Sequence, residues 1–262
     1  MTLPPPSKEL GQHFLVDDNI LGVIGRLAEL GPDDVVLEIG PGPGGLTAFL
    51  ADRVAQVHAV ELDPRLEPYL GARLAEQTNV ELRFADAMTL DPAALEPPPT
   101  KLVSNLPYNV ATPIVVESLD GFPTIGLWCV MLQREVADRF FAEPRTKAYG
   151  SVSVLVQLAA ERTGFHPVSR SVFRPPPNVD SALVAFRRRP DRPPIVWPDL
   201  KRIVEAAFAH RRKRLPNSLE LAGVAERAQA AAALAELDRP PTTRAEELAP
   251  AEFVRLATAL VA

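Results

Sequence analysis

Cysteine is nearly absent from this sequence, and long apolar runs are absent altogether. A single cysteine, Cys129, occurs among 262 residues, which excludes an intramolecular disulfide bond. It stands in the short apolar run Leu127–Leu132, so we expect a buried thiol that packs as a small hydrophobic group. No run is long enough to cross a bilayer, and the N-terminus lacks the pattern of a signal peptide. We therefore expect a cytoplasmic protein without a membrane partner.

What remains is the composition of an ordinary folded protein, with 47% apolar and 23% charged residues. The length suffices for one large domain, or for one with a small appendage. The net charge of −5 disfavours nucleic acid as a partner, but residues 187–216 hold ten basic and three acidic side chains. That segment carries +7 and the rest of the chain −12. A local positive surface is what phosphate contacts need, although a solvated linker and helix face would show the same pattern.

The chain is organised around a glycine-rich stretch behind a short apolar run. Val35–Ile39 predicts a buried strand, residues 40–45 read Gly-Pro-Gly-Pro-Gly-Gly, and residues 46–51 have helical character. Strand, tight loop and helix form the first unit of a nucleotide-binding α/β domain. Glycines allow positive φ and a close approach to a ligand, and the helix start offers unpaired N–H groups. The alternative is a plain turn between a core strand and a helix.

Glu38, two residues before Gly40, indicates which kind of ligand the loop holds. Gly40 and Gly42 belong to a G-x-G-x-G pattern rather than the G-x-G-x-x-G of dinucleotide sites, although Gly45 blurs the distinction. A buried carboxylate at this place suits a ligand with a cationic end better than a pyrophosphate. S-adenosylmethionine has an ammonium and a sulfonium and carries no phosphate. We therefore predict S-adenosylmethionine as the cofactor, and no metal ion.

Acidic residues stand at the ends of the next two predicted strands. The strand Val57–Val60 ends at Glu61, and the strand Val80–Phe84 is followed by Asp86. Glu61 is placed to accept both ribose hydroxyls of an adenosine, and Asp86 is placed to accept from an adenine amino group. Structural acids at strand ends are common, so the combination carries the prediction rather than either residue alone.

The fourth predicted strand, Lys101–Ser104, runs into Asn105-Leu106-Pro107-Tyr108. An exocyclic adenine amine is a poor nucleophile because its lone pair is delocalised into the ring, and two acceptors on its N–H bonds would localise that pair. We predict the Asn105 side-chain oxygen as one acceptor and the backbone carbonyl of Leu106 or Pro107 as the other. Pro107 stiffens the loop, and Tyr108 offers a face on which an extruded base stacks. A simple strand-to-helix turn would use the same residue types.

The remaining patterns complete a sheet and then become purely helical. We expect strands over residues 127–132, 161–168 and 180–187. We expect helices over residues 64–77, 111–119 and 135–141, and one that Asp18 or Asn19 caps and that ends at Leu30. Residues 149–160 fit either type, although their length favours a helix. Four prolines after Arg187 mark a linker. We therefore predict a Rossmann-like α/β methyltransferase domain over residues 1–187 and a small all-helical domain over residues 188–262.

Together these motifs resemble the rRNA adenine N6-dimethyltransferases over nearly the whole chain. The stretch Gly11-Gln12-His13-Phe14-Leu15 is similar to the N-terminal motif of that family, in which Asn is common where this chain has His13. The glycine loop with Gly42, both strand-end acids and the Asn105 loop fall at its further motifs. The resemblance implies S-adenosylmethionine contacts at these residues: His13, Leu15, Gly40, Glu61, Asp86 and Asn105.

Two later stretches resemble the branch that dimethylates two adjacent adenines near the end of small-subunit (16S) rRNA. The first is Phe173-x-Pro-x-Pro with Val179-Asp180-Ser181, and the second is Phe208–Asn217, which matches F-x-x-R-R-K-x-L-x-N. The resemblance implies 16S rRNA in the small subunit or its precursor as the partner, and we expect a monomer. We expect Arg211, Arg212 and Lys213, the densest basic cluster, to contact rRNA phosphates.

Three alternatives to this interpretation remain. One is the 23S rRNA dimethyltransferase branch that gives macrolide resistance, and another is a non-catalytic ribosome-assembly factor of the same fold. The third is a DNA adenine methyltransferase, which expects Pro-Pro after the Asp or Asn, where this chain has Leu106-Pro107.

Overall fold

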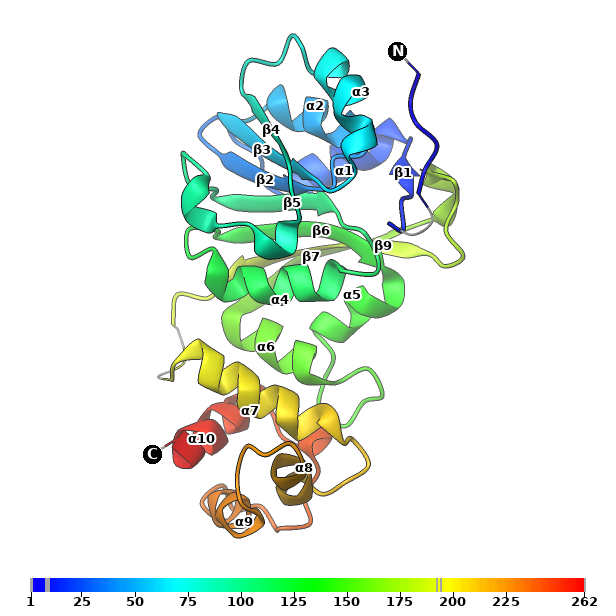
Figure 1. Cartoon of the computed structure of the whole chain (residues 1–262). Helices are drawn as coiled ribbons and strands as arrows, with labels where there is room; N and C mark the ends of the chain where they lie inside the picture. Colours follow the sequence, from blue (N-terminus) through cyan, green and yellow to red (C-terminus); the bar gives the residue numbers. More distant parts are fainter. Residues whose placement is uncertain (1, 8–9, 192, 194, 262) are drawn as a thin grey trace. The chain divides into compact units, whose positions relative to one another are not determined.

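A seven-stranded mixed sheet runs in the order β4-β3-β2-β5-β6-β9-β7 (Figure 1). Neighbouring strands from β4 to β6 are parallel, and β9 pairs antiparallel with β6. The strands are β2 (Val35–Ile39), β3 (Gln56–Glu61), β4 (Val80–Phe84), β5 (Lys101–Asn105), β6 (Leu127–Gln133), β7 (Ala160–Val168) and β9 (Ser181–Arg188). The chain runs outward from β2 to β4 and then returns to β5 on the other side of β2. The carboxyl ends of β2 and β5 therefore form the switch point at which open α/β sheets bind ligands.

Helices cover both faces of the sheet. Helices α1 (Asp18–Leu27) and α2 (Gly45–Ala51) pack on the face that carries Cys129. Trp128 points to the opposite face because successive side chains alternate along a strand, and its indole N–H donates to Ser118 of α4 (Ala111–Gly121) at 2.8 Å. Cys129 is fully buried as expected, and burial raises the pKa of its thiol to about 12. The Rossmann-like α/β prediction is confirmed.

Local features at the starts of two helices explain two differences from the sequence prediction. Asp17, rather than Asp18 or Asn19, caps α1, because its carboxylate accepts from the Asn19 N–H at 2.8 Å. The single helix expected over residues 64–77 is a 3₁₀ turn, Pro64–Leu66, followed by the short α3, Glu67–Arg73. Proline at position 68 has no N–H to donate to the preceding turn, so the α-helical ladder begins anew there.

The structure describes every residue except Met1, Lys8, Glu9, Arg192, Pro194 and Ala262. Arg192 of the basic segment and Pro194 of the predicted linker thus lie outside the described residues. A two-stranded antiparallel sheet joins β1 (Phe14–Leu15) to β8 (Phe173–Arg174). Within the described part of the chain, no helix is both long and apolar enough to span a bilayer.

The chain divides into two compact units, and the second is larger than predicted. It takes in residues 138–161 as well as residues 189–262, and the first unit holds the remainder. Its helices are α6 (Ser151–Ala159), α7 (Trp197–Ala209), α8 (Leu215–Leu221), α9 (Arg227–Ala235) and α10 (Pro250–Val261), while α5 (Arg134–Phe140) crosses the division. The predicted boundary assigned residues 138–161 to the first domain. The structure differs because Tyr149 donates to the Leu248 carbonyl at 2.8 Å and α6 packs against α7 and α10.

Candidate active site

Strands β2 and β5 part at their carboxyl ends. Their ladder pairs Val36 with Lys101 and Leu37 with Leu102, although both strands continue beyond these residues. The Ser104 hydroxyl accepts from the Ile39 N–H at 2.8 Å and takes the place of a ladder hydrogen bond. Next to this opening lies a cavity of about 190 Å³.

The cavity brings together all the cofactor and catalytic residues predicted from the sequence. These residues are His13, Leu15, Gly40, Gly42, Glu61, Asp86, Asn105, Leu106, Pro107 and Tyr108. Glu38 and Gln12 also line it. The predicted RNA-binding residues Arg211, Arg212 and Lys213 lie elsewhere, exposed in the second unit between α7 and α8.

The glycine loop passes close to its neighbours, which explains the need for glycine. Gly40 and Gly42 have φ values of 74° and 55°, in the left-handed region that side chains disfavour. A Cβ atom on Gly42 would lie 3.1 Å from the Phe14 ring, and one on Gly40 would lie 3.5 Å from Pro107. The loop is thus fitted between the N-terminal segment and the Asn105 loop.

Glu61 is buried at the end of β3 and already holds the backbone around it. Its two carboxylate oxygens accept from the Gly42 N–H at 3.0 Å and from the Asp63 N–H at 2.9 Å. Burial raises the pKa of Glu61, and the hydrogen bonds from the backbone oppose that shift. Because a carboxylate offers about four acceptor positions, these backbone donors leave Glu61 able to accept from a ribose hydroxyl as well.

Asp86 is exposed at the end of β4 and uses one oxygen locally. That oxygen accepts from the Met88 N–H at 2.9 Å and caps the short turn Ala87–Thr89. The second oxygen has no partner among the described residues. Asp86 can therefore accept a hydrogen bond from a ligand without giving up its cap.

Glu38 is the least satisfied polar group of the cavity. It is 1% exposed, and neither its Oε2 atom nor the nearby Thr47 hydroxyl has a hydrogen-bond partner among the described residues. Burial raises the pKa of Glu38 to about 8, the Thr47 hydroxyl opposes that shift, and the Glu61 charge adds to it. An orphaned carboxylate beside a cavity indicates a site that a ligand completes. The ammonium group of S-adenosylmethionine fits this requirement, and Glu61 fits its ribose.

The Asn105 amide is held in a defined orientation. Its Nδ2 atom donates to the His13 carbonyl at 3.1 Å, so the amide oxygen is the end available to accept from a substrate. The His13 ring stacks on Tyr108, with centroids 5.4 Å apart and planes inclined by 28°. Its Nδ1 atom donates to the Pro175 carbonyl at 2.8 Å. The N-terminal segment thus orients the amide and one face of the tyrosine together.

Tyr108 is fixed at its other end as well. Its hydroxyl forms a hydrogen bond of 2.5 Å with the buried Ser181 hydroxyl. Burial raises the pKa of the phenol, so the ring stays neutral. A neutral, doubly supported ring can stack on a flat base.

Backbone hydrogen bonds distinguish the Leu106 carbonyl from the Pro107 carbonyl, the two alternatives for the second acceptor. The Pro107 carbonyl accepts from the Val110 N–H at 3.2 Å and closes the turn into α4. The Leu106 N–H donates to the Met131 carbonyl at 3.1 Å, while no described hydrogen bond ends on the Leu106 carbonyl. This arrangement favours Leu106 as the second acceptor.

Two polar residues near the cavity have no role that is predicted from the sequence. Gln12 belongs to the N-terminal motif Gly11–Leu15, and Asp63 lies outside the predicted motifs. A signal was available for Asp63, because Asp followed by Pro64 is typical of a capped turn, and the Asp63 carboxylate does accept from the Arg65 N–H at 3.1 Å. No sequence signal pairs it with Gln12, which lies 51 residues away.

Comparison with known proteins gives close relatives over nearly the whole chain. Residues 6–260 match the family described as ribosomal RNA adenine dimethylase. The ribosomal RNA small subunit methyltransferase A of Rubrobacter xylanophilus is 48% identical over 97% of this chain and 94% of its own length. The protein of the same name from Thermobifida fusca is 43% identical over 96% of this chain and 89% of its own length.

Solved structures of rRNA methyltransferases and related enzymes are also similar to this chain. A dimethyladenosine transferase from Plasmodium falciparum has a TM-score of 0.77 over 93% of this chain and 96% of that one, and at 23% identity it shows the fold alone. The 23S rRNA methyltransferase ErmE is 33% identical, with a TM-score of 0.67 over 95% of this chain and 100% of that one. The chain belongs to the ribosomal RNA adenine dimethylase family.

Proposed function

We propose that the protein transfers methyl groups from S-adenosylmethionine to the N6 amines of two adjacent adenines near the 3′ end of 16S rRNA. The observation that carries this proposal is the Asn105 amide, whose oxygen is left available at the cavity that Glu61 and Glu38 also line. Curated relatives at 48% to 40% identity are named for the small subunit, whereas the 23S enzyme ErmE is 33% identical. Small-subunit rRNA is therefore the preferred substrate over 23S rRNA.

The residues of the cavity divide between holding the donor and preparing the acceptor. When bound, S-adenosylmethionine would supply an electrophilic methyl group on its sulfonium, and the S–CH3 bond that breaks would leave a neutral thioether. Glu61 and Asp86 would accept hydrogen bonds from its adenosine, Glu38 would balance its ammonium group, and the glycine loop would leave room for it. Tyr108 stacks on the extruded adenine, whose two N6–H groups donate hydrogen bonds to the Asn105 side-chain oxygen and the Leu106 carbonyl.

These two acceptors localise the nitrogen lone pair and aim it at the methyl group. No strong base is needed, because the methylated nitrogen carries a positive charge and loses its proton readily to water. In the second transfer the remaining N–H can bond to one acceptor only. Most of the rate enhancement therefore comes from alignment.

The two halves of the Tyr108 side chain are expected to contribute unequally. Tyr108→Phe keeps the stacking face and loses the bond to Ser181, so we expect methyl-transfer activity within about threefold of the original protein. Tyr108→Ala loses the stack, which is worth about 1–3 kcal/mol per base, so kcat/KM should fall about 10- to 100-fold. Steady-state methylation assays measure both variants. Equal activity of the two variants would contradict the stacking role.

The basic cluster between α7 and α8 supports the contact with rRNA. Arg211 is partly engaged, since it lies 3.5 Å from Glu246 and donates to the Lys147 carbonyl at 3.3 Å. Arg212 and Lys213 are exposed and have no ion-pair partner among the described residues. These two side chains are the ones freest to meet phosphates.

Reversing the charges of Arg212 and Lys213 should weaken rRNA binding and reduce its dependence on salt concentration. For Arg212→Glu with Lys213→Glu, the slope of log K against log salt should fall in magnitude by about 2, because each lost phosphate contact removes about 0.9. A matched control reverses Arg227 and Arg255, two exposed arginines of the same unit that lie outside residues 187–216. If both double variants keep the original slope, the cluster does not contact phosphate.

We further propose that the enzyme acts in the cytoplasm, as a monomer, on the assembled small subunit or its precursor. The charge of −12 outside residues 187–216 supports a structured particle over naked RNA, because only a defined surface presents phosphates to the basic segment alone. Methylation rates on naked 16S rRNA and on small subunits test the substrate form. Light scattering tests the monomer.

Mass spectrometry of rRNA fragments tests the function itself. The protein is incubated with ribosomal particles and an isotopically labelled methyl donor. We expect two labelled methyl groups on each of two adjacent adenines of 16S rRNA. Label on one 23S adenine would favour the resistance branch, and no label on either rRNA would favour an assembly factor without catalysis.

A further inference from the structure

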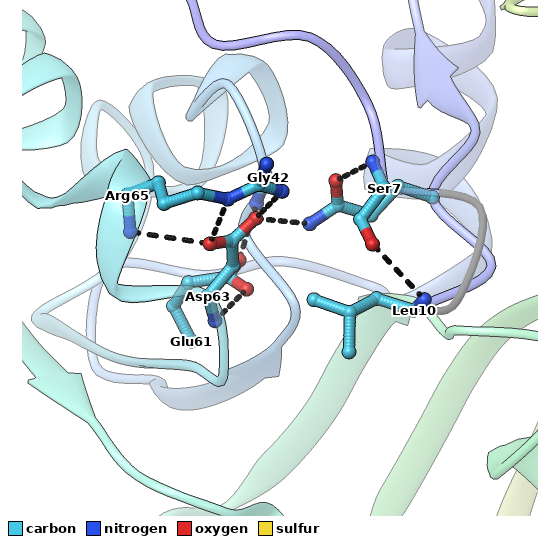
Figure 2. A network of polar contacts seen from close by, with 7 residues as sticks. Ser7, Leu10, Gly42, Glu61, Asp63 and Arg65 are labelled. Atoms are coloured by element: carbon cyan, nitrogen blue, oxygen red, sulfur yellow. Dashed lines mark hydrogen bonds and ion pairs between the residues drawn. The ribbon is translucent and has the colours of Figure 1, made fainter.

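Asp63 is a polar junction two residues beyond Glu61 (Figure 2). It is 2% exposed, and its carboxylate accepts from the Arg65 Nε at 2.8 Å, the Arg65 Nη2 at 2.6 Å and the Gln12 Nε2 at 3.1 Å. The Arg65 guanidinium holds the pKa of Asp63 below its usual value, so the group is ionised. Its own N–H donates to Glu61 at 2.9 Å. The junction is thus connected directly to the ribose-binding carboxylate.

Gln12 connects this junction to the N-terminal segment. The Gln12 Oε1 atom accepts from the Ser7 N–H at 2.7 Å, and the backbone N–H of Gln12 donates to the Ser7 carbonyl at 3.1 Å. The Ser7 hydroxyl accepts from the Leu10 N–H at 3.3 Å. The amide of Gln12 therefore uses its oxygen to close a turn and its nitrogen to attach that turn to Asp63.

The residue after Gln12 is the one that orients the reactive amide. The His13 carbonyl accepts from Asn105, and the His13 ring is held by Pro175 and Tyr108. The paired strand β1 is only two residues long, Phe14–Leu15, so it fixes the segment from one side. Gln12 fixes it from the other side. The hydrogen bond from Gln12 to Asp63 thus attaches the residue directly before His13 to the turn that follows β3.

We propose that Gln12 is a positioning residue for Asn105: by anchoring the N-terminal segment to Asp63, it sets the His13 carbonyl that turns the Asn105 oxygen toward the substrate amine. The same tie couples the donor side of the cavity, through Glu61 and Asp63, to the acceptor side. This inference rests on the methyl-transfer function proposed above.

Gln12→Glu tests the tie with little change in shape. The variant keeps the oxygen that accepts from Ser7, loses the donor, and places a carboxylate against Asp63. A displacement of about 1 Å at a reacting group can cost about 100-fold, so we expect kcat to fall about 10- to 100-fold at pH 8. The dissociation constant of S-adenosylmethionine, measured by calorimetry, should change less than about threefold. Ser7→Ala leaves the tie to Asp63 in place and serves as the matched control with nearly original kcat.

Lowering the pH should restore the kcat of the Gln12→Glu variant. A merely structural role of Gln12 would not produce this pH dependence. A carboxyl group beside another carboxylate has a raised pKa, so the introduced glutamic acid regains a proton to donate to Asp63 as pH falls toward about 6. The ratio of kcat in the original protein to kcat in the variant should therefore shrink toward 1. A ratio that stays constant with pH would overturn the proposal.

A second background links the effect to Asn105. Asn105→Asp removes the donor to the His13 carbonyl while keeping an oxygen acceptor, so adding Gln12→Glu to it should change kcat by less than about twofold. A full 10- to 100-fold loss in that background would overturn the proposal, as would unchanged kcat in the single variant. In each of these outcomes the original protein still methylates rRNA. Failure of the original protein to do so would instead count against the proposed function.

Discussion

Replacing Asn105 with alanine is expected to lower kcat for methyl transfer about 100- to 1000-fold, which is the usual loss when one preorganised polar group of a reaction centre is removed. The alanine variant has no oxygen to accept from the adenine N6–H, so the nitrogen lone pair stays in the ring. Affinity for S-adenosylmethionine should fall less than about tenfold, because at most one neutral hydrogen bond to the cofactor is lost. Single-turnover methylation of small subunits measures the chemical step directly.

Asn105→Asp is the informative companion to this variant. It restores an acceptor oxygen but removes the Nδ2 donor that the His13 carbonyl now fixes at 3.1 Å. We therefore expect kcat to lie between those of the alanine variant and the original protein. An alanine variant with unchanged kcat would show that the amide takes no part in the reaction.

The second large effect concerns stability and pH. The pKa of Glu38 is raised from its ordinary value of 4.5 to about 8. The folded protein therefore favours the protonated form of Glu38. The contribution of this protonated side chain to the free energy of unfolding is complete below pH 4.5 and is lost as pH rises through about 8. Within that window the free energy of unfolding of the ligand-free protein should fall by up to about 1.4 kcal/mol per pH unit from this group.

Urea unfolding of the ligand-free protein between pH 5.5 and pH 8 tests this sign. Glu38→Gln keeps a neutral side chain of the same size at all pH values, so its unfolding free energy should decline less steeply than that of the original protein. The difference between the two curves should reach about 2–3 kcal/mol over that range. Parallel curves would mean that Glu38 is ionised in the empty cavity.

Much of the sheet was predictable because each strand is bounded by a clear change of residue type. The apolar run Val35–Ile39 stops at glycine, and both Glu61 and Asn105 terminate strands as expected. The assignment of residues 138–161 was not predictable. It depends on contacts such as Tyr149 with Leu248, which lie 99 residues apart.

The candidate site shows the same division between local and distant information. Carboxyl ends of parallel strands gather at one edge, so the strand-end residues could be placed in one cavity from their order alone. The contacts of His13 with Pro175 and of Gln12 with Asp63 join residues 162 and 51 positions apart, and no periodicity encodes them. The choice between the Leu106 and Pro107 carbonyls likewise needed the backbone hydrogen bonds.

A crystal structure with bound S-adenosylmethionine is the most direct test of the convergence of these groups on one donor. We predict that its ribose hydroxyls bond to Glu61 beside the glycine loop, and that its methyl group faces the Asn105 oxygen. Donor bound away from the carboxyl ends of β2 and β5, or an Asn105 oxygen turned from the methyl group, would contradict the account.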